Sequence, residues 1–152
     1  MKNPLKLILL LITQISFAQN FAEIKSESFS GVIIPKEYLA KKSNLKHFTP
    51  TEKEIFNLEK IIVNIQNKKE FKANRDIASN VDFNKYIRQY SGFYIGKEKV
   101  IFIQLVPKES IENKKLKWNS EELSSRNEEK CISMNYFITE QKFYELGVCG
   151  NK

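Results

Sequence analysis

Histidine, cysteine and glycine are scarce in this chain of 152 residues. His47 is the only histidine, and neither a second histidine nor a cysteine stands at the spacing that a zinc site requires. The five glycines form neither a GxGxxG nor a Walker pattern, and no serine lies in a GxSxG elbow. The sequence therefore predicts no metal site, no cofactor site and no catalytic residue, and it does not favour an enzyme.

A hydrophobic run long enough to span a membrane is also missing. The most extended apolar segment, residues 7–15, is shorter than the roughly 20 residues that a transmembrane helix needs. It follows a basic head and precedes Ser16-Phe17-Ala18, which is the layout of a cleaved signal peptide. We predict cleavage after Ala18, with residues 1–18 as the signal peptide and residues 19–152 as one secreted or periplasmic α+β domain. No cysteine stands at the cleavage point, so a lipid anchor is not expected.

Arginine occurs at only three positions, and lysines alternate with glutamates along the chain. Losing Lys2 and Lys6 with the signal peptide lowers the 25 basic residues to 23, against 18 acidic ones, so the net charge becomes +5. A nucleic-acid binder would concentrate its basic residues on one element, with arginines to grip phosphates. The sequence therefore predicts a mixed-charge surface and no nucleic-acid partner.

The strongest pattern in the chain is that of an amphipathic helix. Thr49 and Thr51 each precede a glutamate by three residues, Glu52 and Glu54, which is the spacing of a reciprocal N-terminal cap. Apolar residues then recur at helical spacing, at Ile55, Leu58, Ile62 and Ile65. We predict a helix from about Thr51 to Gln66 with one face on a sheet.

Two segments rich in β-branched and aromatic residues predict hairpins. The first joins residues 86–95 to residues 100–106 through a turn at Gly96-Lys97-Glu98, and the second occupies residues 131–149. The predicted fold is therefore α+β, with one helix on an antiparallel sheet of about four strands. Residues 19–30 are polar and are expected to be mobile, while residues 108–130 are expected to be a functional excursion or a mobile linker.

Both cysteines, Cys131 and Cys149, lie in the second hairpin. A three-residue loop that ends in a left-handed Gln141 would pair Ile138 with Lys142 and place the two cysteines directly opposite each other. We predict a disulfide between them, which an oxidising compartment favours. The chain-entropy model values such a link at about 3 kcal/mol.

The same register assigns the two faces of the second hairpin. It places Tyr136 and Tyr144 on the core face, and Phe143 and both cysteines on the outer, wetter face. A reactive thiol is the alternative to the disulfide, but it would need a nearby base, and His47 is more than eighty positions from Cys131 along the chain.

The first hairpin begins with a YxRQYxG pattern at residues 86–92. With the apolar strand at residues 100–106 and the segment Tyr136-Phe137-Ile138-Thr139-Glu140-Gln141-Lys142-Phe143, the chain resembles an uncharacterised family of short exported Bacteroidota proteins. That resemblance implies an exported α+β domain and supplies no activity. The order of one helix and two hairpins also resembles the cystatin-like roll, but the inhibitory QxVxG loop of cystatins is absent, so protease inhibition is not implied.

Tyrosines and one arginine alternate along the first predicted strand of this hairpin. With a tryptophan in the following loop, they form a candidate binding face for a peptide, a glycan or an envelope protein, comprising Tyr86, Arg88, Tyr90, Tyr94 and Trp118. Ordinary burial of this face is the alternative that we favour, but Ile87, Phe93 and Ile95 make the opposite face equally apolar, so the sequence does not show which side of the strand meets the helix. The sequence thus predicts a non-catalytic binding or envelope-associated module, and a small secreted hydrolase that uses Trp118 is the second hypothesis.

Overall fold

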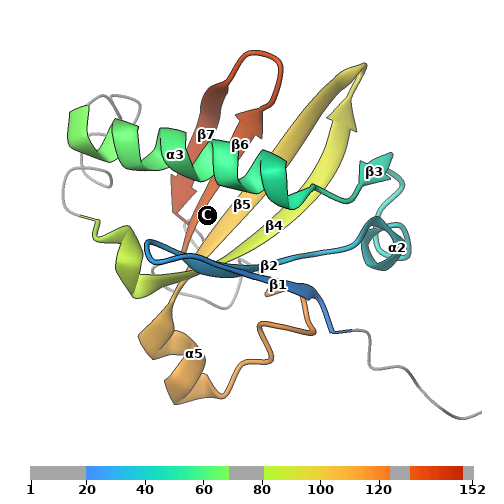
Figure 1. Ribbon diagram of the computed structural model, residues 1–152. Coiled ribbons are helices and arrows are strands. Elements are labelled where there is room, and N and C mark those ends of the chain that lie inside the picture. Colours follow the sequence, from blue (N-terminus) through green and yellow to red (C-terminus); the bar gives the residue numbers. More distant parts are fainter. Residues whose placement is uncertain (1–19, 69–80, 124–130, 149–152) are drawn as a thin grey trace, which may run out of the picture.

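The computed structural model describes residues 20–68, 81–123 and 131–148 (Figure 1). Its strands are β1 (Ala22–Lys25), β2 (Ser30–Ile33), β3 (His47–Phe48), β4 (Tyr86–Ile95), β5 (Glu98–Pro107), β6 (Ile132–Phe137) and β7 (Lys142–Val148). Its described helices are α2 (Lys36–Leu39), α3 (Glu52–Lys68), the 3-10 helix η2 (Phe83–Lys85) and α5 (Lys108–Lys114). The predicted α+β class is confirmed.

One sheet contains all seven strands, in the order β1-β2-β4-β5-β6-β7, with β3 paired to β4 beside β2. Strands β2 and β4 are parallel, and every other pair is antiparallel. Helix α3 lies across one face of the sheet, while α5 lies at the lower end of β5 (Figure 1). The main core fills the space between α3 and the sheet.

The prediction of about four strands and a cystatin-like roll is wrong. The two predicted hairpins form as β4–β5 and β6–β7, but β1, β2 and β3 add to the free edge of β4. Residues 19–30, which were expected to be mobile, contain β1 and the start of β2. These two strands pair with each other, and β2 also pairs with β4. Residues 108–123 likewise fold onto the sheet through α5 and the segment around Trp118.

The cap of α3 selects one of the two predicted threonine–glutamate pairs. The backbone N–H and hydroxyl of Thr51 donate to Glu54 Oε2 over 2.8 and 2.9 Å, and the Glu54 N–H donates back to Thr51 Oγ1 over 3.3 Å. Thr49 is used elsewhere, since its hydroxyl accepts from the Lys36 N–H over 3.0 Å. Lys99 of β5 adds an ion pair of 3.2 Å to Glu54 Oε1, which ties the start of the helix to the sheet.

Replacing Thr51 with alanine is expected to lower the free energy of unfolding by about 1 kcal/mol, because the helix loses its reciprocal cap. Burial acts to raise the pKa of Glu54, but the Thr51 hydrogen bonds and Lys99 outweigh it and lower that pKa below 4.5. The stabilisation by Glu54 is therefore present above pH 4.5 and is lost as the pH falls through the folded pKa.

Urea unfolding followed by circular dichroism between pH 2 and 7 measures this effect. The difference between the wild-type protein and the Thr51→Ala variant should shrink in acid, whereas Thr49→Ala should keep the acid dependence of the wild type. Equal stability of the Thr51→Ala variant and the wild type at neutral pH would contradict the capping role.

The second hairpin has a different register from the predicted one. Phe137, not Ile138, pairs with Lys142, because the Ile138 N–H instead donates to Lys99 O of β5 over 3.1 Å. The loop therefore has four residues, 138–141, and ends as predicted in a left-handed residue, Gln141, with φ 53°. A β-bulge then shifts the register, so that Ile132 pairs with Val148 at the open end.

The four-residue loop also exchanges the predicted faces of Phe143 and Tyr144, because both lie between the loop and the bulge. Phe143 packs on the core side against Tyr136, with ring centroids 4.9 Å apart, while Tyr144 contacts Phe137 on the outer face at 4.9 Å. Cys131 does lie on the outer face, but it is fully buried in a second apolar cluster and not in a wet setting. Cys149 lies outside the described residues, so the disulfide stays a prediction.

Candidate functional site

The candidate binding face that the sequence suggested is divided between the two sides of the sheet. Arg88 and Tyr90 point towards α3 and are 2% and 0% exposed, so neither can contact a ligand on an open surface. Tyr86 and Tyr94 are half-buried at the rim of the same core. Trp118 packs on the opposite side, between two outer clusters. The structure therefore does not bring these five residues into one binding face.

Arg88 and Tyr90 meet a partner that the sequence analysis missed, Glu59 of α3. Arg88 Nε lies 2.9 Å from Glu59 Oε1, in an ion pair whose angle is poor for a hydrogen bond, and the Tyr90 hydroxyl donates to the same oxygen over 2.7 Å. Arg88 Nη1 lies within hydrogen-bond distance of the carbonyls of Phe83 and Tyr86, at 3.4 and 3.3 Å. We call Glu59, Arg88 and Tyr90 the buried triad.

Burial dominates the electrostatics of the triad. It raises the pKa of the Glu59 carboxyl, against the opposing effects of Arg88 and the Tyr90 hydroxyl. It also raises the pKa of Tyr90 well above 10.0, and the Glu59 carboxylate adds to that shift. Arg88 balances the charge of Glu59, so the buried triad joins α3 to β4 and has a structural role.

Trp118 is likewise held in a structural role. The buried amide of Gln89 donates to the carbonyls of Trp118 and Glu121 over 2.7 and 2.8 Å, and its oxygen accepts from the Leu123 N–H over 2.9 Å. These bonds fix residues 118–123 on the outer side of β4.

A different set of aromatic side chains lies on the outer side of the sheet. Val100 pairs with Phe93 on one side and Phe137 on the other, while Asn135 pairs with Phe102 and Tyr144. Directly opposed residues of antiparallel strands share a face. We call Phe93, Phe102, Phe137 and Tyr144 the aromatic face.

The aromatic face is partly exposed among the described residues, and its rings cover Val100, which is 0% exposed. Its three phenylalanines are partly exposed and Tyr144 is 43% exposed. None of the four belongs to a core cluster, and Phe137 and Tyr144 contact each other. Helix α5 and the segment at Trp118 pack instead on the part of the outer face around Val106. Alternate strands lie about 10 Å apart, so the rings spread over a broad, shallow surface.

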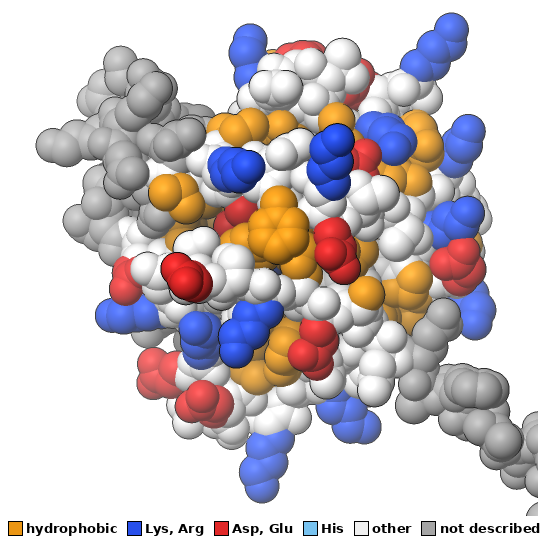
Figure 2. All heavy atoms as spheres, in the orientation of Figure 1, with side chains coloured by type: hydrophobic (Ala, Val, Ile, Leu, Met, Phe, Trp, Pro, Cys, Tyr) orange, Lys and Arg blue, Asp and Glu red, His pale blue; other side chains and the backbone are white. Residues whose placement is uncertain are grey.

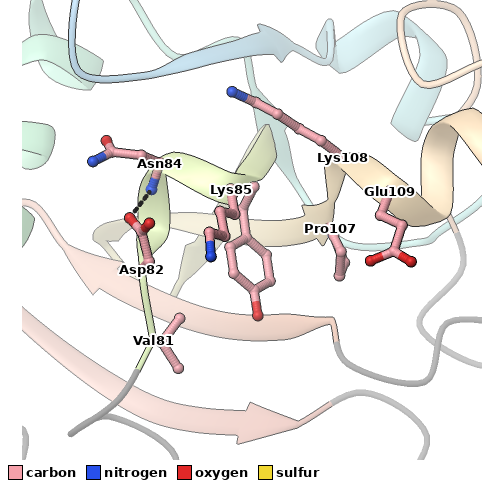
Figure 3. Close-up of a pocket in the computed structure, with 8 residues that line it drawn as sticks. Val81, Asp82, Asn84, Lys85, Pro107, Lys108 and Glu109 are labelled. Carbon is pink, nitrogen blue, oxygen red and sulfur yellow. Dashed lines mark hydrogen bonds between the residues drawn. The ribbon is translucent and has the colours of Figure 1, made fainter.

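Three hollows follow one another around the turn between β1 and β2, and we call them together the β1–β2 groove. The largest, of about 550 Å³, lies between η2 and the start of α5, and Figure 3 shows Val81, Asp82, Asn84 and Lys85 on one side and Pro107, Lys108 and Glu109 on the other. The middle hollow, of about 180 Å³, shares Asn84 and Lys108 with it. The third, of about 420 Å³, shares the turn with the middle hollow and extends to α3.

The chemistry of the groove does not resemble a catalytic centre. No histidine or cysteine is among the described residues that line the three hollows. The Asp82 carboxylate accepts from the Asn84 N–H over 3.1 Å and so caps η2. Within the described ranges, no three or more histidine, cysteine or acidic side chains gather in a way that could hold a metal ion.

The face of the molecule that carries α3 has mixed charge. Figure 2 shows hydrophobic side chains in its middle, with lysine, arginine and acidic side chains around them. The mixed-charge surface expected from the sequence is visible on this face. None of the described helices is both long and apolar enough to cross a membrane.

Comparison with models of known protein families, with curated proteins and with solved structures finds no match to this chain. The resemblance to short exported Bacteroidota proteins therefore stays a prediction, as does the signal peptide. Function is therefore inferred from the geometry of two surfaces, the aromatic face and the β1–β2 groove.

Proposed function

We propose that the protein is an exported, non-catalytic binding module that holds a glycan of the cell envelope on the aromatic face. The observation that carries the proposal is a row of four aromatic side chains on neighbouring strands, one exposed and three partly exposed, that no described core cluster includes. Export, by cleavage after Ala18, is part of the same proposal and is supported by the N-terminal sequence pattern.

The shape and chemistry of the aromatic face favour a glycan. Sugar rings have apolar C–H faces that pack on aromatic side chains, and their hydroxyls can stay hydrated at the rim of a shallow surface. An enzyme would instead need a concave site with titratable groups that converge on the substrate. The charged neighbours of the aromatic face are Lys142, across from Phe137, and Glu140, whose carboxylate accepts from the Tyr144 hydroxyl over 2.6 Å. Both lie at the loop end of the hairpin and do not line a concave site in the described residues.

Replacing Phe102 with alanine is expected to weaken glycan binding about tenfold or more, because truncated aromatic residues at the centre of an interface usually cost this much. Phe102 lies on β5, between β4 and β6, and is therefore central in the aromatic face. Co-sedimentation with purified cell-wall glycan, and calorimetry with soluble fragments of it, measure the change.

Leu45→Ala is the matched control, since Leu45 is 57% exposed and lies outside the aromatic face. It should bind as the wild-type protein does. Equal binding by the wild-type and Phe102→Ala proteins would refute the proposed site. Release of new reducing ends from the glycan would support the second hypothesis, a small secreted hydrolase.

A further inference from the structure

We propose that the β1–β2 groove is a second binding site, for an extended peptide that carries an acidic residue between two apolar residues. The groove lies around the turn of β1 and β2, whereas the aromatic face lies on β4 to β7. The inference is independent of the glycan proposal.

The two ends of the groove each offer apolar surface. At one end Val81, Tyr86 and Pro107 provide it in the largest hollow, whose lining also includes the charged side chains of Asp82, Lys85, Lys108 and Glu109. At the other end Phe29 and Phe56 meet edge to face, with ring centroids 5.6 Å apart, and Val63 beside them is 40% exposed. Each end offers apolar surface to one side chain of a ligand.

The middle of the groove is polar and contains unpaired positive charge. Its lining is Lys25, Ser26, Glu27, Ser28, Phe29, Ser30, Asn84 and Lys108. Among the described residues neither Lys25 nor Lys108 has an ion-pair partner, and the same holds for Lys85 in the adjoining hollow. In the middle hollow two lysines against Glu27 leave an excess of one positive charge, whereas Lys85 and Lys108 in the largest hollow are matched by Asp82 and Glu109. The middle hollow therefore suits a ligand carboxylate, which its serines and Asn84 would flank with hydrogen-bonding groups.

This order of surfaces favours a peptide over other chain-like ligands. A fatty acid would need continuous apolar walls, but here the lysines and serines interrupt them. A glycan lacks the apolar side chains that the two ends would bury. An extended peptide places successive side chains about 3.3 Å apart along its axis, so apolar, acidic and apolar groups can follow one another along the groove.

The test uses acetylated, amidated five-residue peptides of the pattern Leu-Ser-Glu-Ser-Leu, with glutamine or lysine in place of the glutamate as comparisons. Fluorescence anisotropy should show binding of the acidic peptide that weakens with salt. Lys108→Gln should weaken it about three- to tenfold, because Lys108 lines two of the three hollows.

Lys53→Gln is the matched control, since it removes the same charge from an exposed position of α3 outside the groove. Amide chemical shifts should change at residues 25–30 and 82–86 and not at the aromatic face. The proposal is overturned if no peptide of the set binds, if the glutamine peptide binds equally well, or if Lys108→Gln and Lys53→Gln have the same effect. Because this readout contains no glycan, its failure would leave the proposed function untouched.

Discussion

Replacing Arg88 with methionine is expected to lower the free energy of unfolding by about 3–5 kcal/mol, because it leaves a buried carboxylate without its counter-charge. Glu59 is 3% exposed, and Arg88 Nε lies 2.9 Å from its Oε1. The guanidinium also lies within hydrogen-bond distance of two backbone carbonyls, which would lose that donor. Urea unfolding at pH 7, followed by circular dichroism, measures the change.

A triple variant separates the ion pair from the packing around it. Replacing Glu59 with leucine, Arg88 with methionine and Tyr90 with phenylalanine removes all the polar groups of the buried triad at once. Such apolar replacements are often close to neutral, so most of the lost stability should return. Lys53→Met, at an exposed position of the same helix, should change the free energy of unfolding by at most about 0.5 kcal/mol.

A loss below about 1 kcal/mol in Arg88→Met would contradict this account of the buried triad. It would mean that Glu59 is readily hydrated or neutralised without Arg88. Burial already raises the pKa of the Glu59 carboxyl. Without Arg88 the carboxyl could therefore take up a proton, which would remove the uncompensated charge.

Local sequence patterns were sufficient to predict the helix and the two hairpins. The apolar stripe of α3 repeats at the helical period, and its cap is encoded within four residues. The first hairpin needs a residue that tolerates a positive φ at its turn, and Gly96, with φ 62°, supplies it. Each of these features depends on neighbours in the sequence, so each is readable before any tertiary contact is known.

The strands at the edge of β4 were not predictable in this way. Strands β1 and β2 have four residues each and β3 has two. Strands β2 and β3 pair with the edge of β4, and β1 then pairs with β2. Close approach between strands is part of that pairing: a Cβ atom at Gly92 would lie 2.5 Å from Phe48 O of β3. Such a contact joins segments that are distant in the sequence, and the only trace it leaves in the sequence itself is a single glycine, Gly92.

The binding face was misplaced because both faces of the predicted β4 strand are apolar. The sequence showed that Arg88 and Tyr90 share a face, but not which face meets the helix. The available signal was Glu59, which lies four residues after Ile55 and three before Ile62, inside the apolar stripe of α3. A charged residue at such a position needs a partner across the core, and Arg88 was the strongest candidate on a strand.

The predicted disulfide between Cys131 and Cys149 is expected to have the second large effect on the free energy of unfolding. At the open end of the second hairpin, Ile132 pairs with Val148. A disulfide between Cys131 and Cys149 requires this register, because the two cysteines are the next residues outward on the two sides. The four-residue loop alone would have displaced this alignment by one residue, and the bulge restores it. Cys131 is fully buried beside Val106, so a bond there would be protected from reductants.

Reduction is expected to lower the free energy of unfolding by about 3 kcal/mol, because the unfolded chain regains the freedom that the closed loop removes. Urea unfolding with and without reductant measures this loss, and intact mass after alkylation in urea counts the free thiols. The Cys149→Ser variant keeps the Cys131 side chain in its apolar cluster, so it should match the reduced wild type and show no further effect of reductant.

The disulfide would be contradicted if both thiols were alkylated when the protein is unfolded in urea without any earlier exposure to reductant. In that case Cys131 would be a thiol buried in an apolar cluster and shielded from reagents in solution. Either outcome argues against catalysis by Cys131, because its side chain is fully buried in the native protein, whereas free thiols would leave Cys149 as a candidate for reactivity. The difference between the outcomes lies in stability, since only the cross-linked hairpin would resist separation of β6 and β7 when the rest of the sheet opens.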